Sequence, residues 1–201
     1  MPGHPVQRVT ELRVRSAFEP REEPRPFRGE LEQYLLLVRE AGLDVFALRG
    51  SYAGAIGIPQ FMPGSLRRYA VDFNGDGRID LSRSAADAVG SVANFLKQHG
   101  WQAGEPVLYR AKPTPEALAR YVDGSVDPRH RIADLIAAGL ELEPAPQSPD
   151  ALAVLVALGA EYRVGLKNFW VITRYNRSAF YAAAVSDLAD QLAARAQSAG
   201  R

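Results

Sequence analysis

The stretch that decides the fold is "GSYAGAIGIPQFMPGSLRRYAVDFNGDGRIDL", residues 50–81, and its last third has the spacing of a metal-binding loop. Asp72, Asn74 and Asp76 alternate as side-chain oxygen donors, and Gly77 allows the sharp turn that such a loop needs. Hard cations prefer several oxygen ligands, with enough carboxylates to offset the loss of the ion's hydration shell. The pattern therefore predicts a Ca²⁺ site, and a metal-free turn built on Asn and Gly is the alternative.

The end of this loop departs from a twelve-residue calcium loop, in which the last ligand is a bidentate Glu. Arg83 stands at that position, Arg78 can offer only its backbone carbonyl, and Asp80 can act through a water. Asp87, in the first turn of the next predicted helix, is the candidate that closes the site. Ser84 and Asp87 also have the spacing of a helix N-terminal cap, and both roles are compatible because a carboxylate has two oxygens. We expect weak, structural binding.

The first half of the same stretch is apolar and rich in glycine, which lets backbone approach another element or a ligand closely. Ser51 and Gln60 are its polar side chains, next to the flat or soft surfaces of Tyr52, Phe61 and Met62. This combination suits sugar rings, whose apolar faces stack and whose hydroxyls need hydrogen-bond partners. On composition alone, a packed core loop in which Gln60 satisfies backbone groups is favoured.

Helical periodicity dominates the remainder of the chain. Apolar residues recur at helical spacing over residues 29–42 and 82–100, and each pattern ends at a glycine. Short apolar runs between residues 151 and 176, interrupted by Gly159 and Gly165, predict two or three strands, and residues 178–196 predict a final amphipathic helix.

This strand-to-helix junction projects three polar or aromatic side chains, namely Tyr175, Asn176 and Tyr181. Helix capping by Asn176 or Ser178, with both tyrosines packed on the core, is the alternative role.

Composition excludes several classes of protein. The 201 residues carry a formal net charge of +1 and contain no long basic block, so neither nucleic acid nor an anionic membrane is an expected partner. The absence of cysteine excludes disulfides, thiolate zinc sites and a cysteine nucleophile. The three histidines lie far apart, so a metal site built on histidine is not expected. Residues 1–26 are rich in Pro, Arg and Glu and lack the apolar centre of an export signal, so we expect a disordered or aberrant leader.

Taken in order, residues 50–81, "AVGSVANFLKQHGW" (88–101) and "NFWVITRYNRSAFYAAAVSDLAD" (168–190) resemble the membrane-bound lytic transglycosylase B family of murein-cleaving enzymes. The resemblance implies a mainly α fold, with a lysozyme-like helical domain, a small α+β lobe and an EF-hand-like calcium loop. The implied division is a leader at 1–26, a helical part with the calcium loop at 27–104, a mixed α/β lobe at 105–172, and a C-terminal helix at 173–201 that returns to the helical core.

The resemblance also implies a function. The family cleaves the β-1,4 bond between N-acetylmuramic acid and N-acetylglucosamine of peptidoglycan without water, which leaves a 1,6-anhydromuramoyl end. We expect a periplasmic or outer-membrane-associated protein whose partners are glycan strands, with membrane contact only through an anchor that these residues do not contain. The positions that match the glycan cleft are Ser51, Gln60, Tyr175, Asn176 and Tyr181. The implied calcium ligands are Asp72, Asn74, Asp76, the Arg78 carbonyl and Asp87.

The family relies on one glutamate that protonates the glycosidic oxygen. Most enzymes that cleave glycosidic bonds use two carboxylates, and this family is among the exceptions. The glutamate stands in a Val-Glu-Thr helix that the family spacing places before Met1, and Glu11 in "VTELR" has the wrong surroundings. Glu30, Glu32 and Glu40 are expected to be solvated charges on a helix face. We therefore assign no catalytic residue and expect a truncated, inactive form. The alternatives are a non-catalytic, calcium-stabilised peptidoglycan-binding module and, less favoured, a calcium sensor.

Overall fold

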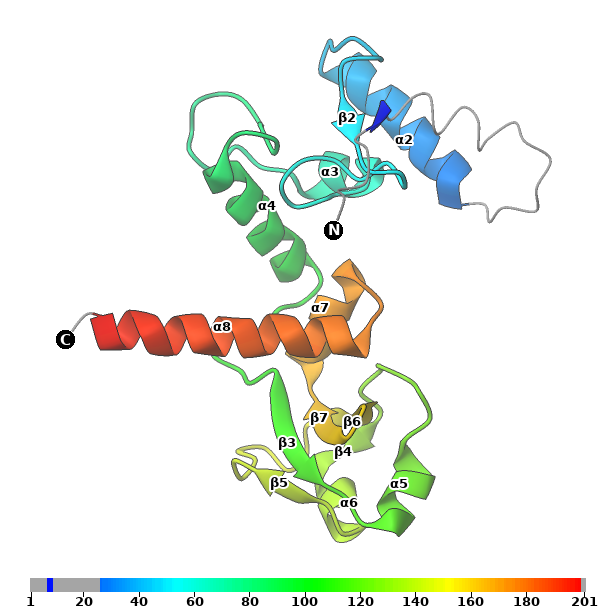
Figure 1. Cartoon of the computed structure of the whole chain (residues 1–201), viewed down its shortest axis with the longest axis vertical. Helices are drawn as coiled ribbons and strands as arrows, with labels where there is room; N and C mark the ends of the chain where they lie inside the picture. The colour runs from blue at the N-terminus through cyan, green and yellow to red at the C-terminus, as the bar shows by residue number, and fades with distance from the viewer. Residues whose placement is uncertain (1–6, 9–25, 200–201) are drawn as a thin grey trace. The chain divides into compact units, whose positions relative to one another are not determined.

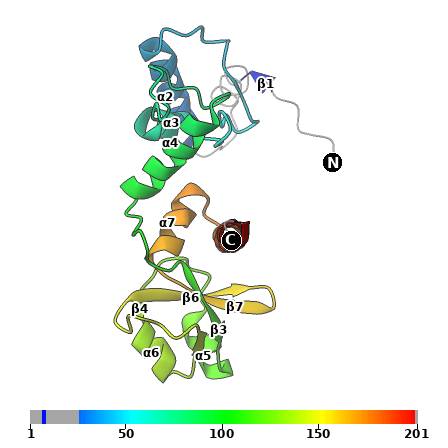
Figure 2. The same cartoon turned by 90° about the vertical axis from the view of Figure 1, so that its left-hand side faces the viewer.

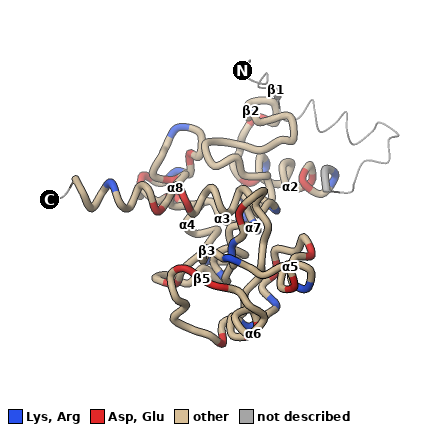
Figure 3. The backbone as a smooth tube through the Cα atoms, turned by 60° about the horizontal axis from the view of Figure 1, so that its bottom comes forward, with Lys and Arg blue, Asp and Glu red and all other residues tan. Residues whose placement is uncertain are grey.

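The computed structural model describes residues 7–8 and 26–199 (Figure 1). The chain divides into two compact units, residues 1–95 and 96–201. The boundaries that the sequence suggests after residues 104 and 172 are finer than this division and stay predictions, and the predicted leader lies almost wholly outside the described residues. Basic and acidic residues are interspersed along both units (Figure 3).

Helices dominate the first unit. They are α2 (Pro26–Glu40), α3 (Pro63–Tyr69) and α4 (Ala85–Gln98), and a short antiparallel pair joins β1 (Gln7–Arg8) to β2 (Arg49–Gly50). Tyr34 and Val38 on α2 are buried together with Ile56, as the helical spacing predicts. Gly42 follows α2 with φ +61°, a conformation that glycine adopts without steric cost, so it ends the helix.

A five-stranded antiparallel sheet with the order β4-β6-β7-β3-β5 forms the centre of the second unit. The strands are β3 (Leu108–Lys112), β4 (His130–Arg131), β5 (Glu141–Glu143), β6 (Leu152–Leu158) and β7 (Glu161–Gly165). The helices are α5 (Pro115–Tyr121), α6 (Ile132–Ala137), α7 (Lys167–Tyr175) and α8 (Ala179–Ala199).

The two faces of this sheet bury two different cores because successive residues of a strand point to opposite sides. Leu155 belongs to the core that α5 and α6 cover, whereas Val154 and Val156 pack with Phe169 and Ala182 from α7 and α8. Figure 2 shows the two helix pairs on opposite sides of the sheet. None of the helices in the described part of the chain combines the length and the apolar character that crossing a bilayer requires.

The prediction of strands continuing through residues 168–175 is wrong. This segment is α7, although Val171, Ile172 and Thr173 are β-branched and favour strands. All three are buried, and Phe169 lies so close to Gly165 that a Cβ atom there would come within 2.4 Å of its ring. Tertiary burial therefore overrides local preference, and the predicted strand-to-helix junction lies between two helices.

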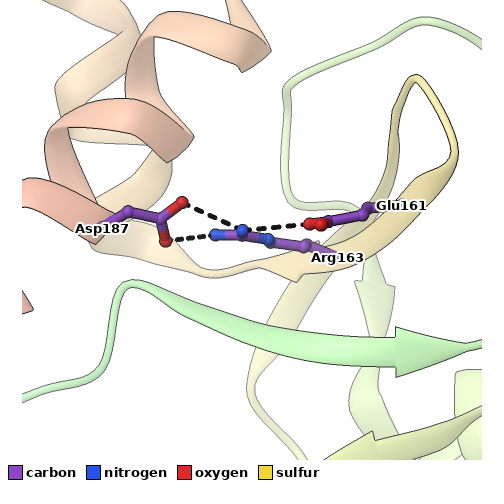
Figure 4. A network of polar contacts seen from close by, with 3 residues as sticks. All are labelled: Glu161, Arg163 and Asp187. Carbon is purple, nitrogen blue, oxygen red and sulfur yellow. Dashed lines mark hydrogen bonds and ion pairs between the residues drawn. The ribbon is translucent and has the colours of Figure 1, made fainter.

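An ion-pair network attaches α8 to β7 (Figure 4). The Arg163 guanidinium donates to both carboxylate oxygens of Asp187, at 2.5 and 2.9 Å, and to Glu161 at 3.1 Å. The Arg163 side chain is only 12% exposed, whereas the Asp187 side chain is 44% exposed. The network therefore fixes α8 on the sheet, while Asp187 keeps part of its hydration.

Candidate functional site

The acidic loop is a series of nested turns closed by its own side chains. The Asp72 carboxylate accepts hydrogen bonds from the N–H groups of residues 75–77 at 2.7–3.2 Å. The Asn74 side chain accepts from the N–H of Asp76 at 3.0 Å, and Asp76 accepts from the N–H of Arg78 at 2.9 Å. These contacts gather the three predicted ligand side chains on one turn.

Asp87 closes the loop from α4. Its side chain is fully buried, with one oxygen accepting from the N–H of Phe73 at 3.0 Å and of Asn74 at 3.4 Å, and the other from the N–H of Asp80 at 3.0 Å. These donors, the Asp80 N–H first, lower the pKa of Asp87 although burial opposes them. The Ser84 hydroxyl accepts from the N–H of Asp87 at 3.1 Å, which confirms the predicted N-terminal cap.

The loop suits a hard cation in the chemistry of its donors. Its carboxylate and amide oxygens are of the type that Ca²⁺ prefers, and each oxygen that accepts one N–H keeps a further lone pair. Across residues 7–8 and 26–199, however, no group of three His, Asp or Glu side chains converges at a metal-binding point. The calcium ligands therefore stay a prediction.

Ser51 and Gln60 occupy two successive turns in the first unit. The Ser51 hydroxyl accepts from the N–H of Ala55 at 3.1 Å and closes the first turn. Gln60 has φ +52°, and its side-chain amide donates to the Gly57 carbonyl at 2.8 Å. A left-handed conformation costs a residue with a side chain about 1–2 kcal/mol, and such strain is found at functional positions. Gln60 is exposed, so its amide oxygen is open to a ligand.

A contact that no local sequence pattern predicts joins the two halves of residues 50–81. The N–H of Ile58 donates to the Leu81 carbonyl at 2.7 Å, and a Cβ atom at Gly57 would lie 2.6 Å from the same oxygen. The glycine content indicates a close backbone approach here, but nothing in the local pattern identifies Leu81 as the neighbour. The end of the acidic loop thus supports the turn that carries Gln60.

Tyr175, Asn176 and Tyr181 come together where α7 turns into α8. The two tyrosine rings are nearly parallel, with centroids 6.4 Å apart and planes at 9°. Burial, and secondarily Tyr181, raises the pKa of Tyr175 to about 12, so its hydroxyl stays protonated at neutral pH. Asn176 is exposed and is the C-cap that follows α7, and the Ser178 hydroxyl caps α8 by accepting from the N–H of Tyr181 at 3.2 Å.

Comparison with known proteins identifies the family. The sequence model described as the transglycosylase SLT domain matches residues 7–190. The chain belongs to this family. It is 43% identical over 174 residues to the membrane-bound lytic murein transglycosylase B of Escherichia coli strain K12. The aligned segment covers 83% of this chain and 46% of the relative.

Two solved structures of lytic transglycosylases share the fold. A structure of SltB1 from Pseudomonas aeruginosa has a TM-score of 0.87 and 44% identity, covering 96% of this chain and 65% of that one. Slt35 from Escherichia coli, solved in complex with calcium, has a TM-score of 0.80 and 38% identity, covering 94% of this chain and 60% of that one. The predicted lysozyme-like fold with a small α+β lobe is therefore confirmed. The chain spans about half the length of the curated relative.

The glutamates of α2 have structural partners in this transglycosylase domain. Glu30 accepts from the N–H of Gly64 in the first turn of α3 at 2.8 Å, and Glu40 pairs with Arg67 at 2.6 Å. The Arg67 hydrogen bond lowers the pKa of Glu40. Glu32 and Glu40 are exposed, as expected, although Glu40 also pairs with Arg67. The expectation of a solvated charge is wrong for Glu30, which is half-buried and ties α2 to α3. Glu11 lies outside the described residues.

The predicted glycan-binding residues thus form two groups. Ser51 and Gln60 lie in the first unit, beside the acidic loop. Tyr175, Asn176 and Tyr181 lie at one helix–helix turn of the second unit.

Proposed function

We propose that this chain is a peptidoglycan-acting lytic transglycosylase module. The family's reaction is cleavage of the β-1,4 bond between N-acetylmuramic acid and N-acetylglucosamine, which gives 1,6-anhydromuramoyl ends, and we expect these residues to bind the strand without cleaving it. The observation that carries the proposal is the family match over residues 7–190, which includes both predicted groups of groove residues.

The chemistry of these groups suits a sugar strand. The paired rings of Tyr175 and Tyr181 offer a flat apolar surface beside hydroxyls that donate and accept. Gln60 is held in a strained turn in which one N–H of its side-chain amide donates to the Gly57 carbonyl, so its amide oxygen and its second N–H are available to sugar hydroxyls. Among the described residues we assign no proton donor, because Glu30 and Glu40 are engaged in joining helices. Peptidoglycan as the ligand agrees with a periplasmic or outer-membrane-associated location.

Incubation with purified sacculi tests this proposal. We expect the chain to sediment with sacculi and to release no anhydromuropeptides detectable by mass spectrometry. A Gln60→Ala, Tyr181→Ala double variant should sediment less, whereas Lys112→Ala on the exposed side of β3 should sediment as the unaltered chain does. Clear anhydro products would identify a proton donor within this chain. The absence of sedimentation would refute both the lytic function and the non-catalytic binding module.

We further propose that the acidic loop binds Ca²⁺ as a structural ion. The proposed ligands are Asp72, Asn74, Asp76, the Arg78 carbonyl and Asp87. Support comes from the oxygen donors gathered by nested turns and from the relative solved with calcium. The ion would neutralise the carboxylates of a loop whose last residues support the Gln60 turn.

A thermal melt with and without Ca²⁺ tests the site. Calcium at a hundred times its dissociation constant should stabilise the folded chain by about 2.7 kcal/mol, because it binds only the folded state. Asp72→Ala should remove this increase, and Asp150→Ala, at an exposed position far along the chain, should retain it. A melting temperature that does not respond to Ca²⁺ would refute the site.

A further inference from the structure

A cavity of about 600 Å³ lies in the second unit, between α7 and the loops that precede β3 and β6. Its lining includes Glu105, Asp127, Leu152, Leu166, Lys167 and Trp170. None of these residues belongs to the predicted glycan groove, and the proposed function leaves the cavity without a role.

Trp170 organises the charged side of this cavity. Its indole N–H donates to Asp127 at 2.9 Å, the Lys167 ammonium nitrogen lies 3.8 Å from the ring centroid, and the Arg174 guanidinium carbon lies 4.4 Å from it. Arg174 also reaches Asp127, at 4.0 Å. Within residues 26–199, by contrast, Lys167 has no carboxylate within 4.0 Å. An aromatic ring attracts a cation without neutralising it, so the Lys167 charge is available to an anionic ligand.

The remaining lining combines apolar surface with carboxylates. Leu152 is 54% exposed although it lies in β6, and Leu166 and two prolines extend this apolar surface. Glu105 is an exposed carboxylate on the rim. A ligand that matches all of these groups has a carboxylate for Lys167, small apolar groups for the floor, and an amine for the acidic rim. A neutral sugar offers no charges, whereas a short zwitterionic peptide offers both.

We propose that this cavity binds the peptide that muramic acid carries in peptidoglycan, an inference that rests on the proposed function. Such stem peptides have small side chains, free carboxylates and, where a diamino acid is present, a free amine. The geometry allows both parts of the substrate to be held by one helix. Trp170 and Tyr175 are five residues apart on α7, which corresponds to about 7.5 Å along the axis and about 140° around it, so the peptide has to pass around part of the helix as well as along it. An extended peptide of five residues spans about 17 Å, so a stem attached to a sugar at Tyr175 reaches the cavity.

Indole NMR provides a direct test, because the chain has only two tryptophans. Trp101→Phe assigns the remaining indole N–H signal to Trp170. Titration with a free stem pentapeptide that contains diaminopimelate should shift the Trp170 signal, whereas a peptide-free N-acetylglucosamine oligomer should not. Loss of a hydrogen bond to a charged group predicts that Lys167→Met raises the peptide dissociation constant about tenfold. The matched control Lys112→Met, on β3, should leave it unchanged.

A second variant guards against an effect of Lys167→Met on folding. Leu152→Ser alters an exposed residue and should weaken peptide binding severalfold while the melting temperature stays the same. A Trp170 signal that does not respond to the peptide would overturn the inference, and the proposed function would still stand if the chain sediments with sacculi. A shift by the peptide without sedimentation would support the cavity and contradict the glycan groove. The inference would also be overturned if Lys167→Met and Leu152→Ser bound the peptide as tightly as the unaltered chain and the Lys112→Met control do.

Discussion

Replacing Gly57 by alanine probes the contact that joins the Gln60 turn to the end of the acidic loop. Gly57 has φ +73°, and a Cβ atom would lie 2.6 Å from the Leu81 carbonyl oxygen and 2.9 Å from the Leu81 carbonyl carbon. The left-handed conformation costs alanine about 1–2 kcal/mol. Overpacking against a well-packed neighbour costs a further 1–3 kcal/mol or so, and here the neighbour is backbone that cannot rotate away. We expect a total loss of about 2–5 kcal/mol.

Gly42→Ala is the matched control, because it separates the two contributions. Gly42 lies in the same unit with φ +61°, but no atom lies within 4 Å of its Cβ position, so only the conformational cost applies. Urea unfolding followed by far-UV circular dichroism measures both variants, since the two tryptophans lie in the other unit. Hydrogen exchange at the Ile58 N–H reports the contact itself, as this group donates to Leu81. Equal losses for the two variants would refute the argument.

The same pair of variants links the contact to function. Both the backbone N–H and the side-chain amide of Gln60 donate to the Gly57 carbonyl, at 3.0 and 2.8 Å. A displaced Gly57 therefore moves Gln60, and Gly57→Ala should sediment less with sacculi than Gly42→Ala does at a temperature where both are folded.

Three further predictions concern buried polar groups. Arg163→Met should lower the free energy of unfolding in urea by about 1–2 kcal/mol, because solvent partly screens the ion pair with Asp187. The control is Arg131→Met, whose 3.6 Å pair with Asp150 is exposed on both sides and should change stability by less than about 0.5 kcal/mol. Similar losses for the two variants would contradict this prediction. Asn168→Leu should lower the free energy of unfolding by about 2–4 kcal/mol, because the buried amide makes three hydrogen bonds with the backbone of the segment before β3. Unaltered hydrogen exchange in that segment would contradict this prediction. The pKa of Asp87 is lower in the folded protein than the value of 3.8 that applies to the unfolded chain. The carboxylate therefore stabilises the fold fully when the pH is above 3.8, and this stabilisation is lost as the pH falls through the lower pKa of the folded state. In EDTA, the free energy of unfolding of Asp87→Asn should fall less at acid pH than that of the unaltered chain. If the two proteins lose stability equally as the pH falls, the buried carboxylate does not have this role.

Local patterns were sufficient for several elements. The helical spacing of α2, the strand-forming runs of β6 and β7, and the cap at Ser84 involve residues within a few positions of one another. Their physical causes are periodic burial and side-chain hydrogen bonds to nearby backbone, which are visible in one short segment. The alternation of Asp72, Asn74 and Asp76 likewise corresponds to nested turns in the structure.

The tertiary structure alone decided the features that join distant segments. Residues 168–175 form a helix because burial against the sheet outweighs their β-branched composition, which a reading of local preference got wrong. The approach of Gly57 to Leu81 and the pairing of Glu40 with Arg67 each connect residues more than twenty positions apart, so no local pattern specifies them. The sequence by itself therefore determined the family, most helices and the turn chemistry, whereas long-range packing decided which side chains are held by partners and which remain open to a ligand.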